Sequence, residues 1–502
     1  MIPTQERPSG HRTKARSEIR NTASEASPKA EVRSRQAGGG QSIRSVTWWR
    51  GEWHEPRDLL RWSAIGGRLC ALAGFVLSLT LPVAAALSPD DMARIEQAIP
   101  REAPAQPAKP RRLLIFDLNV NYGGHGSIPF ANQAFTRMGE VTGAFTTEVS
   151  RDPEVFRPEN LARFDAVFLN NNVGNLFADP ELRDSLAEFV WRGGGLMGVH
   201  GTTVAFTQWP GAIEDWPEFA LMIGARGANH RENKEHVFIK LDDPGHPVNA
   251  AFNGQGWDYR DEFFRVHEPY SRDRLHVLFS IDTEKTDLQQ GRGFGQLERA
   301  DNDFALAWVK PHGRGRVFYC TIAHHPEVFQ DPRMLRFYLA ATQFVMGDLD
   351  GSVRPSNPRA FKGDAPTENT AWWLRQVRSM KGRPFTEMVQ QAAALGQYCV
   401  GAGSTQPVSD TIQKPFGPGL DADERCAVRM ALAGAGLRLS VYVPDPLPPT
   451  AEEAGAMLRF ARRMGALSVA VPSDAADRPL LNRLAAELDL QLVDPVATQE
   501  RN

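Results

Sequence analysis

The feature that most constrains this chain is a glycine-hinged apolar segment, residues 193–202, which reads GGGLMGVHGT. In α/β enzymes, a strand that runs into a Gly-x-nucleophile-x-Gly turn forms a sharp elbow, which lifts one side chain above the carboxyl edge of a parallel sheet. Here that residue is His200 rather than Ser or Cys. An imidazole binds a metal or carries a proton at neutral pH, whereas an acyl-enzyme route needs the missing nucleophile. The pattern favours a site residue at His200; the alternative is a strand end whose histidine hydrogen-bonds nearby backbone.

Composition excludes several classes of protein. Of the 502 residues, 42% are hydrophobic and 23% are charged, which is typical of a soluble globular protein of two or three domains. The net charge of −3 gives no polycationic face, so we expect no nucleic-acid partner. The four cysteines form no CxxC pair, and we expect free buried thiols rather than a disulfide between Cys399 and Cys426.

The N-terminal region predicts export. Residues 1–56 are rich in Arg, Ser, Gly and Glu, which is typical of a disordered leader. Residues 57–86 carry three arginines, then an apolar run over 69–81, then small residues ending at Ala86, which is the pattern of a secretory signal peptide. The run is shorter than the roughly 20 apolar residues that span a bilayer. We therefore expect a periplasmic or secreted protein without permanent membrane insertion.

A first α/β domain is expected over residues 111–350, after a proline-rich lead-in at 87–110. Alternating apolar strands and amphipathic helices predict a parallel, doubly wound sheet; the strands lie at 113–117, 145–149 and 166–170, and the helices at 128–139 and 180–192. A β-rich part follows, with strands expected at 236–241, 262–266, 277–281, 305–310 and 315–322 and a closing helix at 332–346.

A linker at residues 351–378 leads to a second βα unit over 379–497. Its helices are expected at 385–395, 427–435, 451–464 and 479–488, and its strands at 437–443, 468–471 and 491–493.

The loop over residues 121–129, NYGGHGSIP, follows the first strand and opens the first helix. It therefore lies on the same carboxyl edge as the elbow. Ser127 is expected to cap that helix and to contact substrate, which leaves His125 available as a metal ligand or acid–base group.

Two further segments supply candidate site residues. Glu262 begins a predicted strand, and a carboxylate beside histidines acts as a ligand or a general base. His324 and His325 end another strand; because adjacent strand residues face opposite ways, we favour His324. The charge-dense run from His230 to His236 is expected to be a solvated loop.

Three tryptophans, Trp209, Trp216 and Trp257, lie in predicted loops after the elbow. Exposed indoles beside a polar pocket suit stacking on sugar rings, and we expect Trp209 and Trp257 to contact substrate. The alternative is that these rings pack beneath a lid. His246, between Gly245 and Pro247, is expected to serve turn geometry.

Five segments in order resemble the ThuA-like, trehalose-utilisation family; they are residues 124–129, 194–200, 242–247, 261–263 and 313–319 leading to His324. The resemblance covers residues 111–350 and implies a class I glutamine-amidotransferase-like, flavodoxin-like fold. It also implies a role in sugar metabolism and a metal site. The nucleophilic Cys of the amidotransferases is absent, so glutamine hydrolysis is not implied.

Residues 379–497 resemble part of a sugar-phosphate isomerase/epimerase TIM barrel, through residues 414–420 and 436–442. The resemblance covers only the first few βα units, without the later strands that supply metal ligands, so isomerase activity is not implied. A partial barrel leaves open sheet edges, which we expect to be buried against the first domain or in a homodimer.

Together these observations predict a secreted protein that uses trehalose or an oxidised disaccharide, by metal-assisted hydrolysis or elimination on a sugar. His200, Glu262 and His125 are the expected catalytic residues. His125, His200 and His324 are the expected ligands of a divalent transition metal such as zinc. The alternative is a non-catalytic sugar-binding or interaction module that works with a partner sugar enzyme.

Overall fold

The computed structural model describes residues 87–211, 213–293, 297–360, 370–475 and 477–495 of the chain. The predicted leader and signal peptide lie outside these residues. Among the described helices, none is both long enough and apolar enough to cross a membrane.

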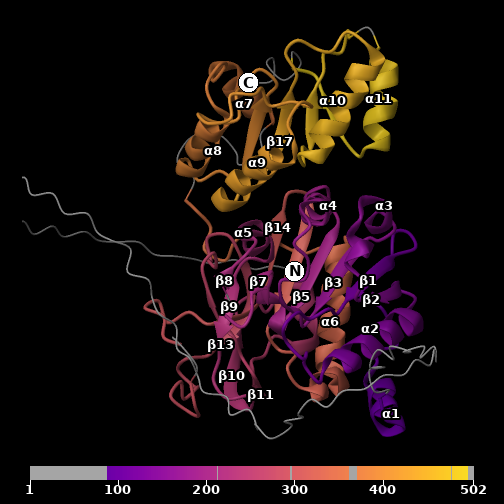
Figure 1. Ribbon diagram of the computed structural model, residues 1–502, viewed down its shortest axis with the longest axis vertical. Helices are drawn as coiled ribbons and strands as arrows, with labels where there is room; N and C mark the ends of the chain where they lie inside the picture. The colour runs from indigo at the N-terminus through magenta and orange to yellow at the C-terminus, as the bar shows by residue number, and fades with distance from the viewer. Residues whose placement is uncertain (1–86, 212, 294–296, 361–369, 476, 496–502) are drawn as a thin grey trace, which may run out of the picture. The chain divides into compact units, whose positions relative to one another are not determined.

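The first domain is built on a nine-stranded mixed sheet in the order β11-β10-β13-β14-β15-β5-β3-β1-β2 (Figure 1). Its parallel half comprises β1 (Arg112–Phe116), β2 (Thr146–Ser150), β3 (Ala166–Asn170), β5 (Gly195–Val199) and β15 (Gly315–Cys320). Its antiparallel half comprises β10 (Glu235–Leu241), β11 (Trp257–Asp261), β13 (His276–Ile281) and β14 (Ala305–His312). The parallel sheet expected from the βα alternation is formed by β1, β2 and β3, and the β-rich part that follows adds the antiparallel half.

Helices cover both faces of this sheet. One face packs against α1 (Pro89–Ala98), α2 (Ile128–Thr142) and α6 (Pro332–Met346), and the other against α3 (Pro158–Leu161), α4 (Pro180–Trp191) and α5 (Pro217–Ile223). Successive strand residues point to opposite faces, so Leu113 and Ile115 enter one core while Leu114 and Phe116 enter the other. The domain is thus three layers, α/β/α.

Short elements complete the first domain. The small strand pairs are β4 (Val173–Gly174) with β6 (Val204–Ala205), β7 (Thr207–Gln208) with β8 (Ile213–Glu214), and β9 (Arg226–Asn229) with β12 (Arg265–His267). The 3₁₀ turns are η1 (Pro153–Phe156), η2 (His200–Thr203), η3 (Pro247–Phe252) and η4 (Pro326–Gln330).

The strand expected over residues 262–266 is not formed. Strand β11 ends at Asp261, and β12 begins only at Arg265. Glu262, Phe263 and Phe264 are all buried, with 7%, 0% and 7% of their surface exposed. Three consecutive buried side chains do not follow the alternation of a strand with one solvent face. Strand β14 continues through His312, two residues beyond the predicted end at 310.

The C-terminal unit has its own parallel sheet in the order β16-β17-β18-β19, formed by β16 (Cys399–Gly403), β17 (Arg438–Val443), β18 (Ser468–Ala470) and β19 (Gln491–Val493). Its helices are α7 (Thr370–Ser379), α8 (Phe385–Ala394), α9 (Ala422–Ala435), α10 (Ala451–Arg463) and α11 (Arg478–Glu487). Among the described cysteines, Cys320 and Cys399 are buried, as expected, whereas Cys426 is partly exposed.

Candidate metal centre

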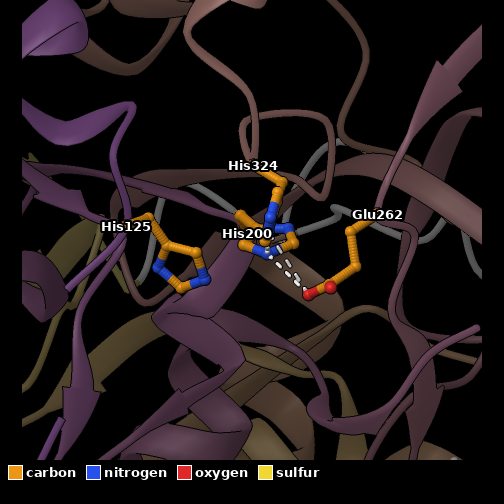
Figure 2. A group of neighbouring side chains, drawn as sticks. All are labelled: His125, His200, Glu262 and His324. Atoms are coloured by element: carbon orange, nitrogen blue, oxygen red, sulfur yellow. Dashed lines mark hydrogen bonds and ion pairs between the residues drawn. The ribbon is translucent and has the colours of Figure 1, made fainter. Parts of the chain in front are cut away.

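Four side chains converge at the carboxyl end of the parallel half of the sheet (Figure 2). They are His125, His200, Glu262 and His324, which follow β1, β5, β11 and β15, and their ligand atoms all lie within 4.8 Å of one another. We call these residues the His3Glu cluster. Four loops that are distant in sequence meet here because their strands end at one edge of the sheet.

His200 opens η2 directly after β5, and it is completely buried. Its φ of +44° lies in the left-handed region, which is costly for a residue with a Cβ and is maintained only where neighbours fix it. The Tyr319 hydroxyl does so by donating a hydrogen bond of 2.8 Å to the His200 carbonyl oxygen. The predicted elbow is therefore present, with His200 at its turn.

The hydrogen bonds of His200 define its tautomer. Its Nδ1 lies 2.8 Å from the Thr321 carbonyl oxygen, which can only accept, so Nδ1 carries the proton. Burial lowers the pKa of His200 more strongly than its contacts with Glu262 raise it, which favours the neutral ring. The unprotonated Nε2 then faces Glu262 Oε1 at 3.3 Å and His324 Nδ1 at 3.2 Å. The Nε2 lone pair and the negative Glu262 oxygen repel each other at this distance, and a cation between the two atoms would satisfy both.

Glu262 is 7% exposed and contacts three histidines. Its Oε1 lies 3.4 Å from His324 Nδ1, and its Oε2 lies 3.3 Å from His230 Nδ1. Burial opposes ionisation, but the neighbouring His200 and His324 rings outweigh it and hold the pKa of Glu262 well below its usual range. Burial also acts on His324, and there the hydrogen bond and charge of Glu262 raise the pKa.

His125 completes the cluster as a neutral ring. Its Nδ1 is buried and has no hydrogen-bond partner among the described residues, while its Nε2 lies 3.3 Å from the Tyr122 hydroxyl. Burial, followed by the charges of His200 and His324, lowers the pKa of His125 to about 2.

The distances among three of the four ligand atoms fit a tetrahedral ion. Zinc binds imidazole nitrogen and carboxylate oxygen at about 2.0–2.2 Å, which places neighbouring ligand atoms about 3.4 Å apart. The three pairs among His200 Nε2, His324 Nδ1 and Glu262 Oε1 measure 3.2, 3.3 and 3.4 Å. Imidazole and carboxylate donors suit zinc and other divalent first-row metals. The residues present therefore fit the predicted metal.

Ser127 lies at the predicted helix start but makes no side-chain cap. Its hydroxyl donates to the Ala323 carbonyl oxygen at 2.6 Å instead, because the loop after β15 offers a buried acceptor. The buried Asn171 joins the same loops: its Nδ2 donates to Ser127 Oγ at 3.2 Å and to Ala323 O at 3.1 Å, while Gly201 N–H donates to its Oδ1 at 3.3 Å. Sequence reasoning missed Asn171, although three consecutive asparagines at the end of β3, Asn170 to Asn172, were a signal.

The segment from His230 to His236 is only partly the expected solvated loop: residues 232–234 are exposed, but its two ends are not. His230 contacts Glu262, and Arg231 and Glu235 are 7% and 0% exposed. The Arg265 guanidinium pairs with Glu235 at 2.6 Å, which neutralises the buried carboxylate. Nothing in the spacing of this segment signals that His230 reaches the cluster, since the contact depends on β9 pairing with β12.

Of the two adjacent histidines after β15, the structure brings His324 to the cluster, while His325 contacts the Asn233 carbonyl oxygen. The buried Asp261 fixes this loop through a hydrogen bond of 3.3 Å from the His324 N–H. Burial raises the pKa of Asp261 to about 8.

The three tryptophans have different surroundings. Trp209 lies 5.8 Å, between ring centroids, from Tyr122, which contacts His125. Trp216 is 6% exposed and packs in the core. Trp257 begins β11 and stacks on Phe252 at 3.9 Å, so the structure does not bring it to the cluster. His246 serves a turn, as expected, because its Nδ1 accepts the Val248 N–H at 3.2 Å.

Comparison with known proteins adds a family match. Solved structures similar to this chain include a ThuA-like protein of Bacteroides uniformis ATCC 8492, at 20% identity over 48% of this chain and 94% of that chain, with a TM-score of 0.38. A ThuA-like protein of Parabacteroides merdae ATCC 43184 gives 18% identity over 49% and 93%, with a TM-score of 0.35. A β-galactosidase of Rahnella sp. R3 gives 14% identity over 48% and 32%, with a TM-score of 0.30. These TM-scores are too low to bear on function.

No curated protein matches the chain. The barrel resemblance expected for residues 379–497 stays a prediction. Residues 112–345 match the family model ThuA, described as trehalose utilisation, which confirms the resemblance expected for the first domain over those residues.

Proposed function

We propose that this chain is a metal-dependent enzyme of carbohydrate utilisation, which hydrolyses or eliminates at a glycosidic bond of trehalose or an oxidised disaccharide outside the cytoplasm. The observation that carries the proposal is the His3Glu cluster, in which His200 Nε2 and Glu262 Oε1 face each other at 3.3 Å. The match of residues 112–345 to the trehalose-utilisation family supports the carbohydrate role.

In this proposal His125, His200 and His324 hold the ion, and Glu262 completes the set or acts as a base. The bound metal supplies a Lewis acid that polarises a substrate oxygen and lowers the pKa of bound water. Oε2 is the Glu262 oxygen that does not contact His200 or His324; it faces His230 Nδ1 at 3.3 Å and is the atom that would take a proton if Glu262 acts as the base. His230 is 24% exposed at its side chain, and its Nδ1 also contacts the Arg231 carbonyl oxygen, so it holds the outer side of Glu262 near solvent.

The substrate side is expected at Tyr122 and Trp209, whose rings meet edge to face at 5.8 Å beside His125. Indole and phenol faces stack on the apolar face of a sugar ring. This aromatic pair also favours the second candidate, a non-catalytic sugar-binding module, because it would hold a sugar whether or not the cluster turns it over.

We also propose a fold for each of the two parts of the chain. The parallel strands β2-β1-β3-β5-β15, with helices on both faces, support a doubly wound, flavodoxin-like parallel half. The four parallel strands β16 to β19 and their helices support a partial barrel in the C-terminal unit.

The test is elemental analysis of the purified chain together with turnover of plain and oxidised disaccharides, for the parent and for His200→Ala. We expect about one divalent transition metal per parent chain, and loss of both metal and turnover in the variant. The matched control is His246→Ala, because His246 is also buried and hydrogen-bonded to backbone but caps η3, away from the His3Glu cluster. Each substitution removes a buried partner at a cost of about 1–3 kcal/mol.

The control separates loss of ligand from loss of stability. If both variants lose stability but only His200→Ala loses metal, the cluster is a metal centre. Tight sugar binding without turnover by a metal-loaded parent would favour the second candidate. A parent without metal, with normal sugar turnover in His200→Ala, would contradict the proposed function.

A further inference from the structure

A polar cavity lies at the end of the central sheet opposite to the His3Glu cluster. It has a volume of about 370 Å³, within the range of small-molecule sites, and its polar lining includes Arg274, Lys310, His312, Arg354, Tyr398 and Arg438. His312 pairs with Gly315 at the start of β15, whereas His324 follows the end of β15. The length of that strand therefore separates this cavity, which we call the β14 cavity, from the His3Glu cluster.

Lys310 and His312 lie on one face of β14, because alternate residues of a strand point the same way. Lys310 is 6% exposed, and its Nζ donates to the Met222 carbonyl oxygen at 3.3 Å. Burial, with the charge of Arg274, lowers the pKa of Lys310 to about 7. A basic amine that retains only a carbonyl partner after burial is poorly compensated.

His312 is 2% exposed, and neither ring nitrogen has a hydrogen-bond partner among the described residues. Its only close aromatic neighbour in the described part of the chain is Trp191, edge to face at 4.8 Å. Buried polar side chains are normally satisfied, and an unsatisfied one in a cavity signals a ligand or water that supplies the partner. The neutral imidazole offers one N–H donor to such a partner.

Arg274 and Arg354 both line the cavity. Arg274 donates to the Gly434 carbonyl oxygen at 3.3 Å and to the Pro269 carbonyl oxygen, and it also pairs with the exposed Glu268 carboxylate at 3.5 Å. The backbone at Arg354 is fixed, since its N–H donates to Ser352 Oγ at 3.1 Å and its carbonyl contacts His276 Nδ1. The Arg354 guanidinium itself makes no hydrogen bond or ion pair to a described residue. Both carry donors that match the oxygens of a planar or tetrahedral anion.

No acidic side chain is among the described residues that line the cavity. We propose that the β14 cavity binds a small molecule with a phosphate or carboxylate group, whose oxygens accept hydrogen bonds from Lys310, His312, Arg274 and Arg354. An anion there would satisfy the unpaired His312 and neutralise the buried Lys310 at once. This site does not depend on the function proposed for the His3Glu cluster.

The proposal is tested by isothermal titration of the full chain at pH 6.5 with inorganic phosphate, glucose 6-phosphate and gluconate. We expect one site per chain and at least tenfold weaker binding in Lys310→Met and in Arg354→Gln. The matched control is Arg333→Gln, which removes another exposed arginine whose only ion pair in the described chain is with Asp331 at 3.4 Å. That variant should bind as the parent does.

The two sugar ligands identify the chemistry of the ligand. Tighter binding of glucose 6-phosphate than of gluconate assigns a phosphate, and the reverse assigns a carboxylate. Absence of binding for all three anions at millimolar concentration would overturn the proposal, as would binding that neither variant weakens. Lys310 is buried and Arg354 is exposed, so Arg354→Gln decides the question if Lys310→Met does not fold.

Discussion

His200 shows at the level of one residue how the candidate site is held. Its left-handed backbone would relax if its carbonyl and its Nδ1 were not both engaged, by the Tyr319 hydroxyl and the Thr321 carbonyl oxygen. Neither contact touches the proposed ion. Their effect is to aim Nε2, which is the usual task of groups behind a metal-binding histidine.

Tyr319→Phe should therefore weaken metal binding about tenfold or more, because Nε2 loses its fixed direction. The matched control is Tyr442→Phe in the C-terminal unit, where the hydroxyl also donates to a backbone carbonyl, that of Phe416, at 3.1 Å. Both variants should lose about 1 kcal/mol of unfolding free energy. Competition with a chromogenic chelator measures the metal affinity, and equal affinities in the two variants would contradict the role given to Tyr319.

At the level of elements, β5 depends on glycine for its approach to α6. A Cβ on Gly195 would lie 2.6 Å from the Val345 carbonyl oxygen, a backbone atom that cannot swing aside. We expect Gly195→Ala to lower the unfolding free energy by about 1–3 kcal/mol. Gly434→Ala in α9 is the control, because a Cβ there meets nothing within 4 Å and alanine favours the helix. Urea unfolding followed by circular dichroism compares them; equal stability would refute the close-packing argument.

Strand β14 gives a pH dependence. Sulfate keeps its charge between pH 6 and 9, so any change in its binding to the β14 cavity reports the protein. The basic groups around Lys310 are Arg274, His312, Arg354 and Arg438. Guanidinium groups stay charged in this range, and burial, together with the charges of Lys310 and Arg429, holds the pKa of His312 well below its usual value. Lys310, with its pKa lowered to about 7, is the group that loses a proton.

Sulfate affinity should therefore fall as the pH rises above 7, by as much as about tenfold per unit. In Lys310→Met the affinity should be low and independent of pH. In Lys310→Arg it should be independent of pH and closer to that of the parent at pH 6. Titration calorimetry from pH 6 to 9 measures all three, and a parent whose affinity stays constant would contradict the role of Lys310.

Elements with complete local signals could be predicted from sequence. Helix α6 begins and ends at the predicted residues, because Asp331 caps its start, Pro332 follows, and Gly347 ends it with a φ of +84°. Strand β16 was missed because Gly401 and Gly403 weaken its apolar pattern. They are needed where Val377 of α7 packs closely, and that contact is invisible in sequence.

His125, His200 and His324 could be named because each was expected after the end of a strand, where the edge of a parallel sheet gathers side chains, and Glu262 because a carboxylate beside histidines suits a metal. His230 and Asn171 could not, since their contacts exist only once loops from three or more elements meet. Trp257 was expected to contact substrate, but it stacks on Phe252, away from the cluster. Phe252 lies in a 3₁₀ turn that the sequence did not predict.

At the level of the whole molecule, buried ion pairs connect α9 with α4 and α5. Arg429 is 1% exposed and pairs with Glu218 at 2.5 Å and with Asp184 at 3.0 Å, while Arg425 pairs with Glu188 at 2.9 Å. Such pairs are costly to break singly, because the remaining charge stays buried without its partner. This network is consistent with the expectation that the C-terminal unit does not stand alone.

Glu218→Gln should lower the unfolding free energy by about 3 kcal/mol, since Arg429 then keeps a single close carboxylate. Glu268→Gln is the matched control, because Glu268 is 83% exposed at its side chain and its pair with Arg274 measures 3.5 Å. That change should be within about 0.5 kcal/mol of the parent. Denaturant unfolding of the full chain measures both, and a loss below about 1 kcal/mol for Glu218→Gln would show that the network contributes little.

The origin of the four cluster residues has a consequence for how the chain comes apart. His125 and His324 lie roughly 200 residues apart along the chain, and a bound ion would tie these two positions into one closed loop of polypeptide. Such a tie acts as a reversible cross-link, comparable to a disulfide but removable by a chelator. In the first domain, removal of that one ion would free the loops after β1 and β15 to separate before the sheet itself unfolds.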